Sequence, residues 1–67
     1  MIRITVNGEA REVPEGLTLT GLLAHLALDP RMVVVEHNRV IVRRTGLDGV
    51  QVGAGDEVEI VHFVGGG

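Results

Sequence analysis

The feature that most constrains the fold is a single helical stripe of leucines set between two blocks of strand-like sequence. In the segment "LTLTGLLAHLALDP", leucines recur at i, i+3, i+4 and i+7, the spacing that makes one apolar face on an α-helix. These are Leu19, Leu22, Leu23 and Leu26. Thr18 is the expected N-cap, and Asp29-Pro30 is the expected end, because a residue before proline avoids the helical region. A lone amphipathic helix needs a sheet on which to bury that face.

The segment before the helix, "IRITVNGEAREV", has the pattern of a β-hairpin. Ile2, Ile4 and Val6 alternate with polar residues, which is the period of a half-buried strand. Asn7-Gly8 supplies the positive φ angles of a tight turn. The second strand, residues 10–13, is more polar and is expected at an edge of the sheet.

The segment after the helix contains three further strand patterns. "RMVVVEHNRVIV" predicts two strands around a turn at His37-Asn38, and "EVEIVHF" predicts the last strand. The glycine-rich loop between them is expected to reach the core through Leu47, with a short helical turn there, and through Val50 or Val52. The order predicts an α+β fold, a mixed sheet of four or five strands packed on one helix, with the first and last strands parallel at its centre. This is the β-grasp arrangement of ubiquitin-like proteins.

Length and composition limit the classes of function. With 67 residues and 45% hydrophobic content, the chain makes one small domain, predicted as residues 1–64, followed by a flexible glycine tail at 65–67. A core this thin leaves no room for a catalytic cleft, so the chain is not expected to be an enzyme on its own. The apolar runs are far shorter than the ~20 residues of a membrane span, and no signal peptide precedes the first strand, which together predict a cytoplasmic protein.

Metal, phosphate and nucleic-acid sites are not indicated. There is no cysteine, and the three histidines have no metal-ligand spacing. The glycines of "GLDGVQVGAGDE" lie between strands with no helix following, so they indicate turns rather than a phosphate loop. A net charge of −3 and a single aromatic residue argue against nucleic acid as a partner.

The last residues, "EIVHFVGGG", carry the remaining chemistry. Gly65, Gly66 and Gly67 lack Cβ atoms, so they can thread a narrow channel in a partner enzyme. An α-carboxyl group with a pKa of ~3.5 is ionised and unreactive at neutral pH. Conversion to an acyl-adenylate supplies a leaving group, which a sulfur donor can displace to give a thiocarboxylate. The alternative is that the glycines are only a frayed end or an expression remnant.

Two apolar surfaces are candidates for partner docking. If Val58 and Ile60 face the core, strand alternation sends Val61 and Phe63 outward, next to the tail. The alternative is a bulge near the end of the strand that turns Phe63 into the core. The run 32–35, which includes Val34, is apolar on both faces, which indicates either an inner strand or an exposed patch that offers a second surface.

The ending "AGDEVEIVHFVGGG" resembles that of the thiamine-pathway sulfur carriers, the ThiS-type ubiquitin-like proteins. "IRITVNGEAREVPEGLTLTGLLAHL" and "VVVEHNRVIV" are similar to their first hairpin, helix and middle strands, so that the resemblance covers nearly the whole chain. It implies that a ubiquitin-activating-type adenylyltransferase, holding ATP and Mg²⁺, adenylates Gly67, which forms the diglycine motif with Gly66. It further implies that sulfur from cysteine-desulfurase chemistry is passed to thiazole synthase.

Other readings share part of this pattern. A sulfur carrier for molybdopterin synthesis or for tRNA thiolation would have the same fold and the same glycine end. A non-catalytic β-grasp binding module, such as the TGS type, would not need a free terminus and would be expected to show a basic or aromatic face.

Overall fold

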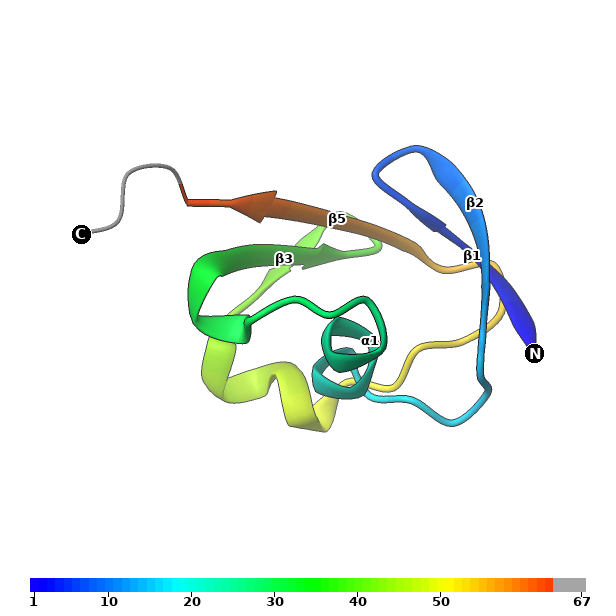
Figure 1. Ribbon diagram of the computed structural model, residues 1–67, viewed down its shortest axis with the longest axis horizontal. Coiled ribbons are helices and arrows are strands. Elements are labelled where there is room, and N and C mark those ends of the chain that lie inside the picture. Colours follow the sequence, from blue (N-terminus) through cyan, green and yellow to red (C-terminus); the bar gives the residue numbers. More distant parts are fainter. Residues whose placement is uncertain (64–67) are drawn as a thin grey trace.

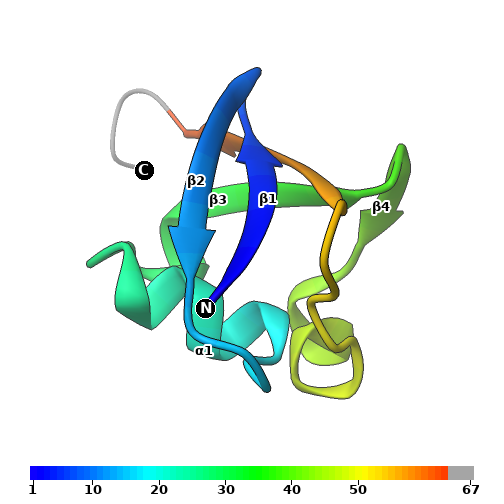
Figure 2. The same ribbon diagram turned by 90° about the vertical axis from the view of Figure 1, so that its right-hand side faces the viewer.

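The computed structural model describes residues 1–63. The strands and helices along the chain are β1 (Ile2–Val6), β2 (Glu9–Val13), α1 (Leu19–His25), the 3₁₀ turn η1 (Pro30–Met32), β3 (Val33–His37), β4 (Val40–Val42), the 3₁₀ turn η2 (Arg44–Gly49) and β5 (Glu57–His62). The strands form one sheet in the order β2-β1-β5-β3-β4. The sheet curves over α1 and η2, which lie together on one of its faces (Figures 1 and 2).

The pairing of the strands confirms the predicted mixed β-grasp sheet, with five strands. β1 pairs with β5 in parallel, whereas β1 with β2, β3 with β4 and β3 with β5 pair antiparallel. The last strand therefore lies at the centre of the sheet, and β2 lies at an edge as its polar sequence predicted. The predicted division into a domain of residues 1–64 and a tail of 65–67 stays a prediction, because residues 64–67 lie outside the described part.

The first hairpin turns where the sequence predicted. Asn7 and Gly8 have φ angles of 50° and 83°, the left-handed conformation that a two-residue turn between twisted strands requires. β2 begins at Glu9, one residue earlier than expected, because the turn is this short.

The helix is shorter than its leucine spacing suggested. Thr18 is the N-cap as predicted, and its hydroxyl accepts a hydrogen bond of 3.1 Å from Gly21 N–H. The predicted stop at Asp29-Pro30 is wrong, since α1 ends at His25. Ala27 takes a left-handed φ of 60°, and Leu28 N–H donates back to a carbonyl in the last turn at 2.8 Å. This C-terminal turn ends the helix before proline can act on it.

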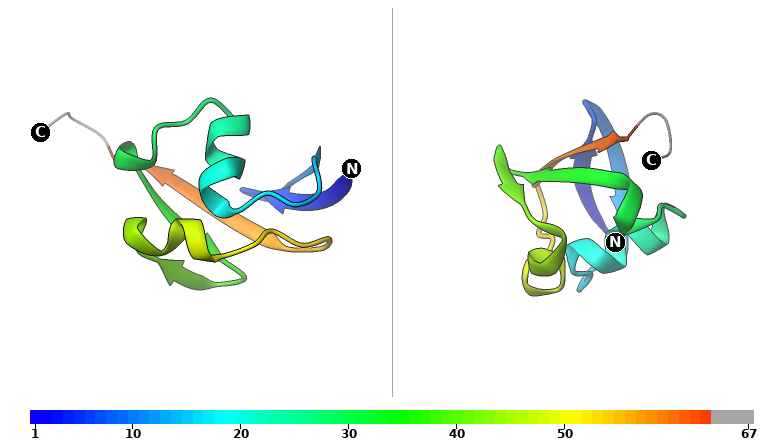
Figure 3. Two further views of the ribbon diagram at one scale, coloured as in Figure 1. Left: turned by 90° about the horizontal axis from the view of Figure 1, so that it is seen from below. Right: turned by 90° about the vertical axis from the view of Figure 1, so that its left-hand side faces the viewer.

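The core fills the space between the sheet and α1. The residues buried there are Ile4, Val6, Val13, Leu19, Leu22, Leu23, Val33, Val35, Leu47, Val52, Val58 and Ile60. Leu47 lies on η2, beside α1 (Figure 3), which confirms both the predicted helical turn and its contact with the core. Val52 is also buried, whereas Val50 and Leu26 are half-buried at the margin of the core.

Candidate functional site

The site that the sequence predicted lies where β5 ends. β5 pairs with β1 on one side and β3 on the other, and β3 covers it from Val58 to His62. One residue further on, Phe63 N–H donates to the Met32 carbonyl at 2.9 Å. The strand is thus held by the sheet up to the last described residue. Gly65, Gly66 and Gly67, the predicted reactive tail, lie outside the described residues.

Two asparagines from different turns hold β5 by its backbone. Asn7 Oδ1 accepts from Ile60 N–H at 2.7 Å, and Asn7 Nδ2 donates to the Ile60 carbonyl at 3.1 Å. On the other side, Asn38 Oδ1 accepts from Glu57 N–H at 2.9 Å, and Asn38 N–H donates to the Glu57 carbonyl at 2.8 Å. Both asparagines have left-handed φ angles, 50° and 49°, which turn residues of this type tolerate. The two turns therefore hold β5 in place as well as connecting the strands of their own hairpins.

Alternation along β5 places apolar side chains on the outer face of the sheet. Val58 and Ile60 point into the core, with exposed fractions of 1% and 6%. Val61 and Phe63 are 59% and 56% exposed. The outward orientation of Phe63 is confirmed, and the alternative bulge that would bury it is wrong.

The neighbouring strands extend this surface. Val34 is half-buried and lies directly opposite Val61 in the register of β3 with β5. Ile41, on β4, is 66% exposed and lines a shallow groove together with Val34 and Phe63. We call Val34, Ile41, Val61 and Phe63 the outer apolar patch.

The run of residues 32–35 contributes less surface than the sequence suggested. Val33 and Val35 are buried in the core, at 8% and 2% exposure. Val34 is half-buried, and Met32 is 41% exposed. The prediction of an inner strand is therefore confirmed, because β3 lies between β5 and β4 and turns Val33 and Val35 into the core, and only Val34 of the strand contributes to the outer surface.

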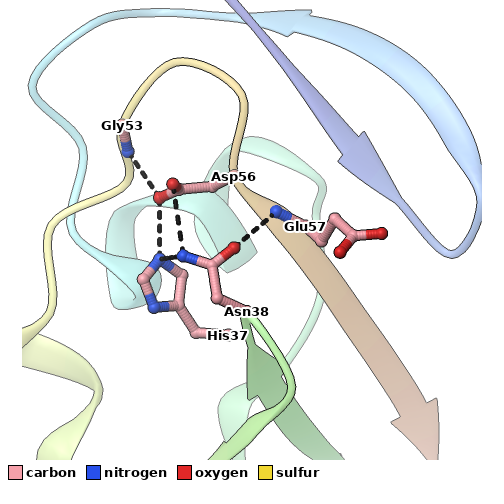
Figure 4. A network of polar contacts seen from close by, with 5 residues as sticks. All are labelled: His37, Asn38, Gly53, Asp56 and Glu57. Atoms are coloured by element: carbon pink, nitrogen blue, oxygen red, sulfur yellow. Dashed lines mark hydrogen bonds and ion pairs between the residues drawn. The ribbon is translucent and has the colours of Figure 1, made fainter.

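A polar network that the sequence did not predict joins the start of β5 to the turn after β3 (Figure 4). His37 Nε2 lies 2.7 Å from Asp56 Oδ2, which also accepts from Gly53 N–H at 2.7 Å. Asn38 Nδ2 donates to Asp56 Oδ1 at 3.3 Å. Because an ionised carboxylate only accepts hydrogen bonds, His37 Nε2 carries the proton in this contact.

The electrostatics of the network favour an ionised Asp56. Partial burial acts to raise the pKa of Asp56, but hydrogen bonds from Gly53, His37 and Asn38 outweigh it and hold the pKa below its ordinary value. The network fixes the 53–56 loop against the 37–38 turn, at the end of β5 that is remote from Phe63. It therefore supports the strand rather than forming part of the surface around the tail.

Cofactor sites are not evident in the described part of the chain. Within residues 1–63, no three histidine or acidic side chains come together in a way that could hold a metal ion. No helix in this part is long and apolar enough to cross a membrane.

The sheet order, the single helix over its inner face and the central last strand define a ubiquitin-like β-grasp protein. The model of the ThiS family matches residues 4–67, and the chain belongs to that family. The resemblance seen in the sequence is thereby confirmed.

Curated relatives of two kinds are similar to this chain. The thiazole synthases of Magnetococcus marinus and Paramagnetospirillum magneticum are each 41% identical over 66 residues, 98% of this chain. The chain spans only 20% of the length of either one. The sulfur carrier protein ThiS of Bacillus subtilis is 42% identical over 50 residues, which are 75% of this chain and 76% of that protein.

Solved structures agree with this assignment. The crystal structure of the thiamine biosynthesis protein ThiS from Geobacter metallireducens superposes with a TM-score of 0.85 at 38% identity, and covers 98% of this chain and 100% of that one. A solution structure of a thiamine biosynthesis protein from the same organism gives a TM-score of 0.81 at 36% identity. It covers 98% of this chain and 88% of that one.

Proposed function

We propose that this protein is a sulfur carrier for the thiazole moiety of thiamine, and that the α-carboxyl group of Gly67 carries the sulfur. The observation that carries the proposal is that the ThiS family match runs through Gly67, directly beyond a last strand that the sheet holds up to Phe63. A sulfur carrier ThiS and two thiazole synthases among the relatives support the pathway.

The proposed reaction takes place on a partner. A ubiquitin-activating-type adenylyltransferase, with ATP and Mg²⁺ bound to it, joins AMP to the Gly67 carboxylate and releases pyrophosphate. A persulfide sulfur derived from cysteine-desulfurase chemistry then attacks the carbonyl carbon; the C–S bond forms and AMP leaves. A thiol cleaves the S–S bond of the resulting acyl disulfide, which releases the thiocarboxylate and leaves the thiol in a disulfide with the sulfur donor. Thiazole synthase takes the sulfur from the resulting thiocarboxylate. We propose the cytoplasm as the location of the reaction, since these steps consume ATP and cysteine.

The fold supports a passive role for this chain in the chemistry. β5 is paired with β3 as far as His62, and Phe63 N–H donates to the Met32 carbonyl, so the position of Phe63 is fixed. The outer apolar patch lies beside that point and offers the partner a surface to bind. Phe63, Val61 and Val34 are accordingly proposed as docking residues, and Gly65 and Gly66 as the narrow segment that enters the partner.

Intact mass spectrometry tests the proposal. The protein is incubated with its cognate adenylyltransferase, ATP, Mg²⁺ and sulfide, and we expect one oxygen to be replaced by sulfur. Deletion of Gly67 should abolish the change. Gly49→Ala is the matched control, since Gly49 has open space around its Cβ position and an ordinary φ, and it should react as the wild type does. Absence of the sulfur adduct on a folded wild-type chain with a free Gly67 carboxyl group would overturn the proposal.

A further inference from the structure

The outer face of β3 and β5 is ordered in rows from the tail end inward. Phe63 lies next to Met32, and the next row pairs Val61 with Val34. The row after that pairs Glu59 with Glu36. On β3 and β5, apolar side chains therefore occupy the half of the face near the tail and carboxylates the half away from it, while Ile41 on β4 lies opposite Glu36.

Two arginines border the apolar half. Arg43 and Arg44 follow β4 and line the same groove as Val34, Ile41 and Phe63. Both are exposed, and neither has an ion-pair partner among residues 1–63. Arg31 also lines the groove, but its guanidinium already contacts Asp29 at 2.9 Å. The net positive charge of the groove therefore comes from Arg43 and Arg44.

The acidic half carries a repulsive pair. Glu36 and Glu59 stand directly opposite each other on antiparallel strands, an arrangement that lowers stability when both side chains are ionised. Arg39 lines the same hollow as Glu36 and Glu59, but the ion pair that it makes is with Glu57, at 3.8 Å. Within the described residues, the charges of Glu36 and Glu59 are not neutralised by an ion pair.

We propose that this face docks a partner protein that sets carboxylates against Arg43 and Arg44 and basic side chains against Glu36 and Glu59, with apolar side chains between them on the outer apolar patch. The inference rests on the proposed function, since the partner is the adenylyltransferase that receives the tail. It adds the charge pattern that the partner's surface must carry.

The order of charges gives the docking a direction. Entry of the tail requires its end of β5 to face the partner's channel, and the charge order favours the same orientation. In the reversed sense, the partner's carboxylates would meet Glu36 and Glu59, and its basic groups would meet Arg43 and Arg44, which costs free energy at every contact. In the favoured orientation, the tail end of β5 lies against the acidic part of the partner's surface. The entrance of the channel that binds the tail is therefore expected there.

Charge reversal of the two arginines tests the inference. ATP–pyrophosphate exchange by the cognate adenylyltransferase is measured against carrier concentration, at low and high ionic strength. For the double variant Arg43→Glu with Arg44→Glu, we expect the KM for the carrier to rise about tenfold or more at low salt, with kcat nearly unchanged. The double variant Arg43→Gln with Arg44→Gln should show a smaller rise, and Glu36→Lys with Glu59→Lys should also raise KM.

The matched control is Arg11→Glu. Arg11 is an exposed arginine on β2, the edge strand opposite β4, and its reversal makes the same change in net charge as the single variant Arg43→Glu, which is measured beside it. An equal rise in KM for Arg11→Glu, or no rise for the Arg43 and Arg44 variants, would overturn the inference while the wild type is still adenylated. A change in self-association of the arginine variants on sedimentation, without a change in KM, would instead assign the face to a second copy of this chain and would also overturn it. Failure of the folded wild type to be adenylated would reject the proposed function itself.

Discussion

The Asn7 side chain holds the backbone of Ile60 with both of its polar atoms, at 2.7 Å from Ile60 N and 3.1 Å from Ile60 O. The two residues are 53 positions apart, so this contact closes the first hairpin onto the last strand. It continues the parallel β1–β5 ladder, whose paired residues end at Val6 and Val58. A turn residue thus acts as a clamp on the strand that leads to the tail.

Replacement of Asn7 should destabilise the fold. Asn7→Gly keeps the left-handed φ but removes both hydrogen bonds, and we expect a loss of about 1–3 kcal/mol in the free energy of unfolding. Asn7→Ala should lose about 1 kcal/mol more, because alanine is strained at a φ of 50°. Urea unfolding measures both. Wild-type stability for Asn7→Gly would show that the clamp contributes nothing.

Asp56 should make stability depend on pH. The pKa of Asp56 is lower in the folded chain, so the unfolded chain binds the proton more readily. The contribution of Asp56 to the free energy of unfolding is therefore complete above the ordinary pKa of 3.8. It is lost as the pH falls through the lower pKa of the folded chain. Asp56→Asn should therefore cost about 1–3 kcal/mol at pH 7 and progressively less in acid.

The measurement is urea unfolding of both proteins across the acid range. Asp48→Asn is the control, because Asp48 is exposed on η2 and its side chain makes no hydrogen bond or ion pair within residues 1–63. A constant difference between wild type and Asp56→Asn down to the most acidic pH would contradict the assignment of an ionised, hydrogen-bonded Asp56.

The N-cap of α1 should be needed for full stability. Thr18→Ala removes the acceptor for Gly21 N–H and should lower the free energy of unfolding by about 1 kcal/mol. Thr18→Ser keeps the hydroxyl and should restore most of it. Thermal unfolding followed by circular dichroism compares the three proteins, and equal losses for alanine and serine would point to packing of the methyl group instead.

Phe63 should matter for partner binding and not for folding. Its side chain is 56% exposed, so we expect Phe63→Ala to leave the melting temperature nearly unchanged. As an aromatic anchor it should contribute about 2 kcal/mol to docking, which is roughly a thirtyfold rise in the KM for the carrier in adenylation.

Val40→Ala is the matched control for Phe63→Ala. Val40 is 64% exposed on β4, outside the outer apolar patch. Loss of melting temperature in Phe63→Ala together with normal adenylation would show that the aromatic side chain is structural.

Much of the sheet could be predicted because alternation is a local signal. The spacing of Ile2, Ile4 and Val6 predicted β1. On β5, the inward positions of Val58 and Ile60 implied that Val61 and Phe63 face outward. The resemblance to the ThiS family then supplied the prediction that the glycine tail is the part that reacts. These features depend on residue spacing within a few positions, which the sequence displays directly.

The parts that escaped prediction depend on contacts between distant segments. His37 and Asp56 are 19 positions apart, and no spacing rule connects a turn after one strand to the loop before another. The early end of α1 depends on Ala27, a residue type that seldom adopts the left-handed φ seen here. The roles of Asn7 and Asn38 on β5 were hidden for the same reason, because each looked like an ordinary turn residue.

The central claim is that sulfur is carried on the α-carboxyl group of Gly67, and peptide-level mass spectrometry tests it most directly. The protein is incubated with its adenylyltransferase, ATP, Mg²⁺, a cysteine desulfurase and cysteine labelled with heavy sulfur, and is then digested. We predict the label in the peptide that ends at Gly67, as a thiocarboxylate. Label found on another peptide, or none on a folded chain whose Gly67 carboxyl group is free, would contradict the account.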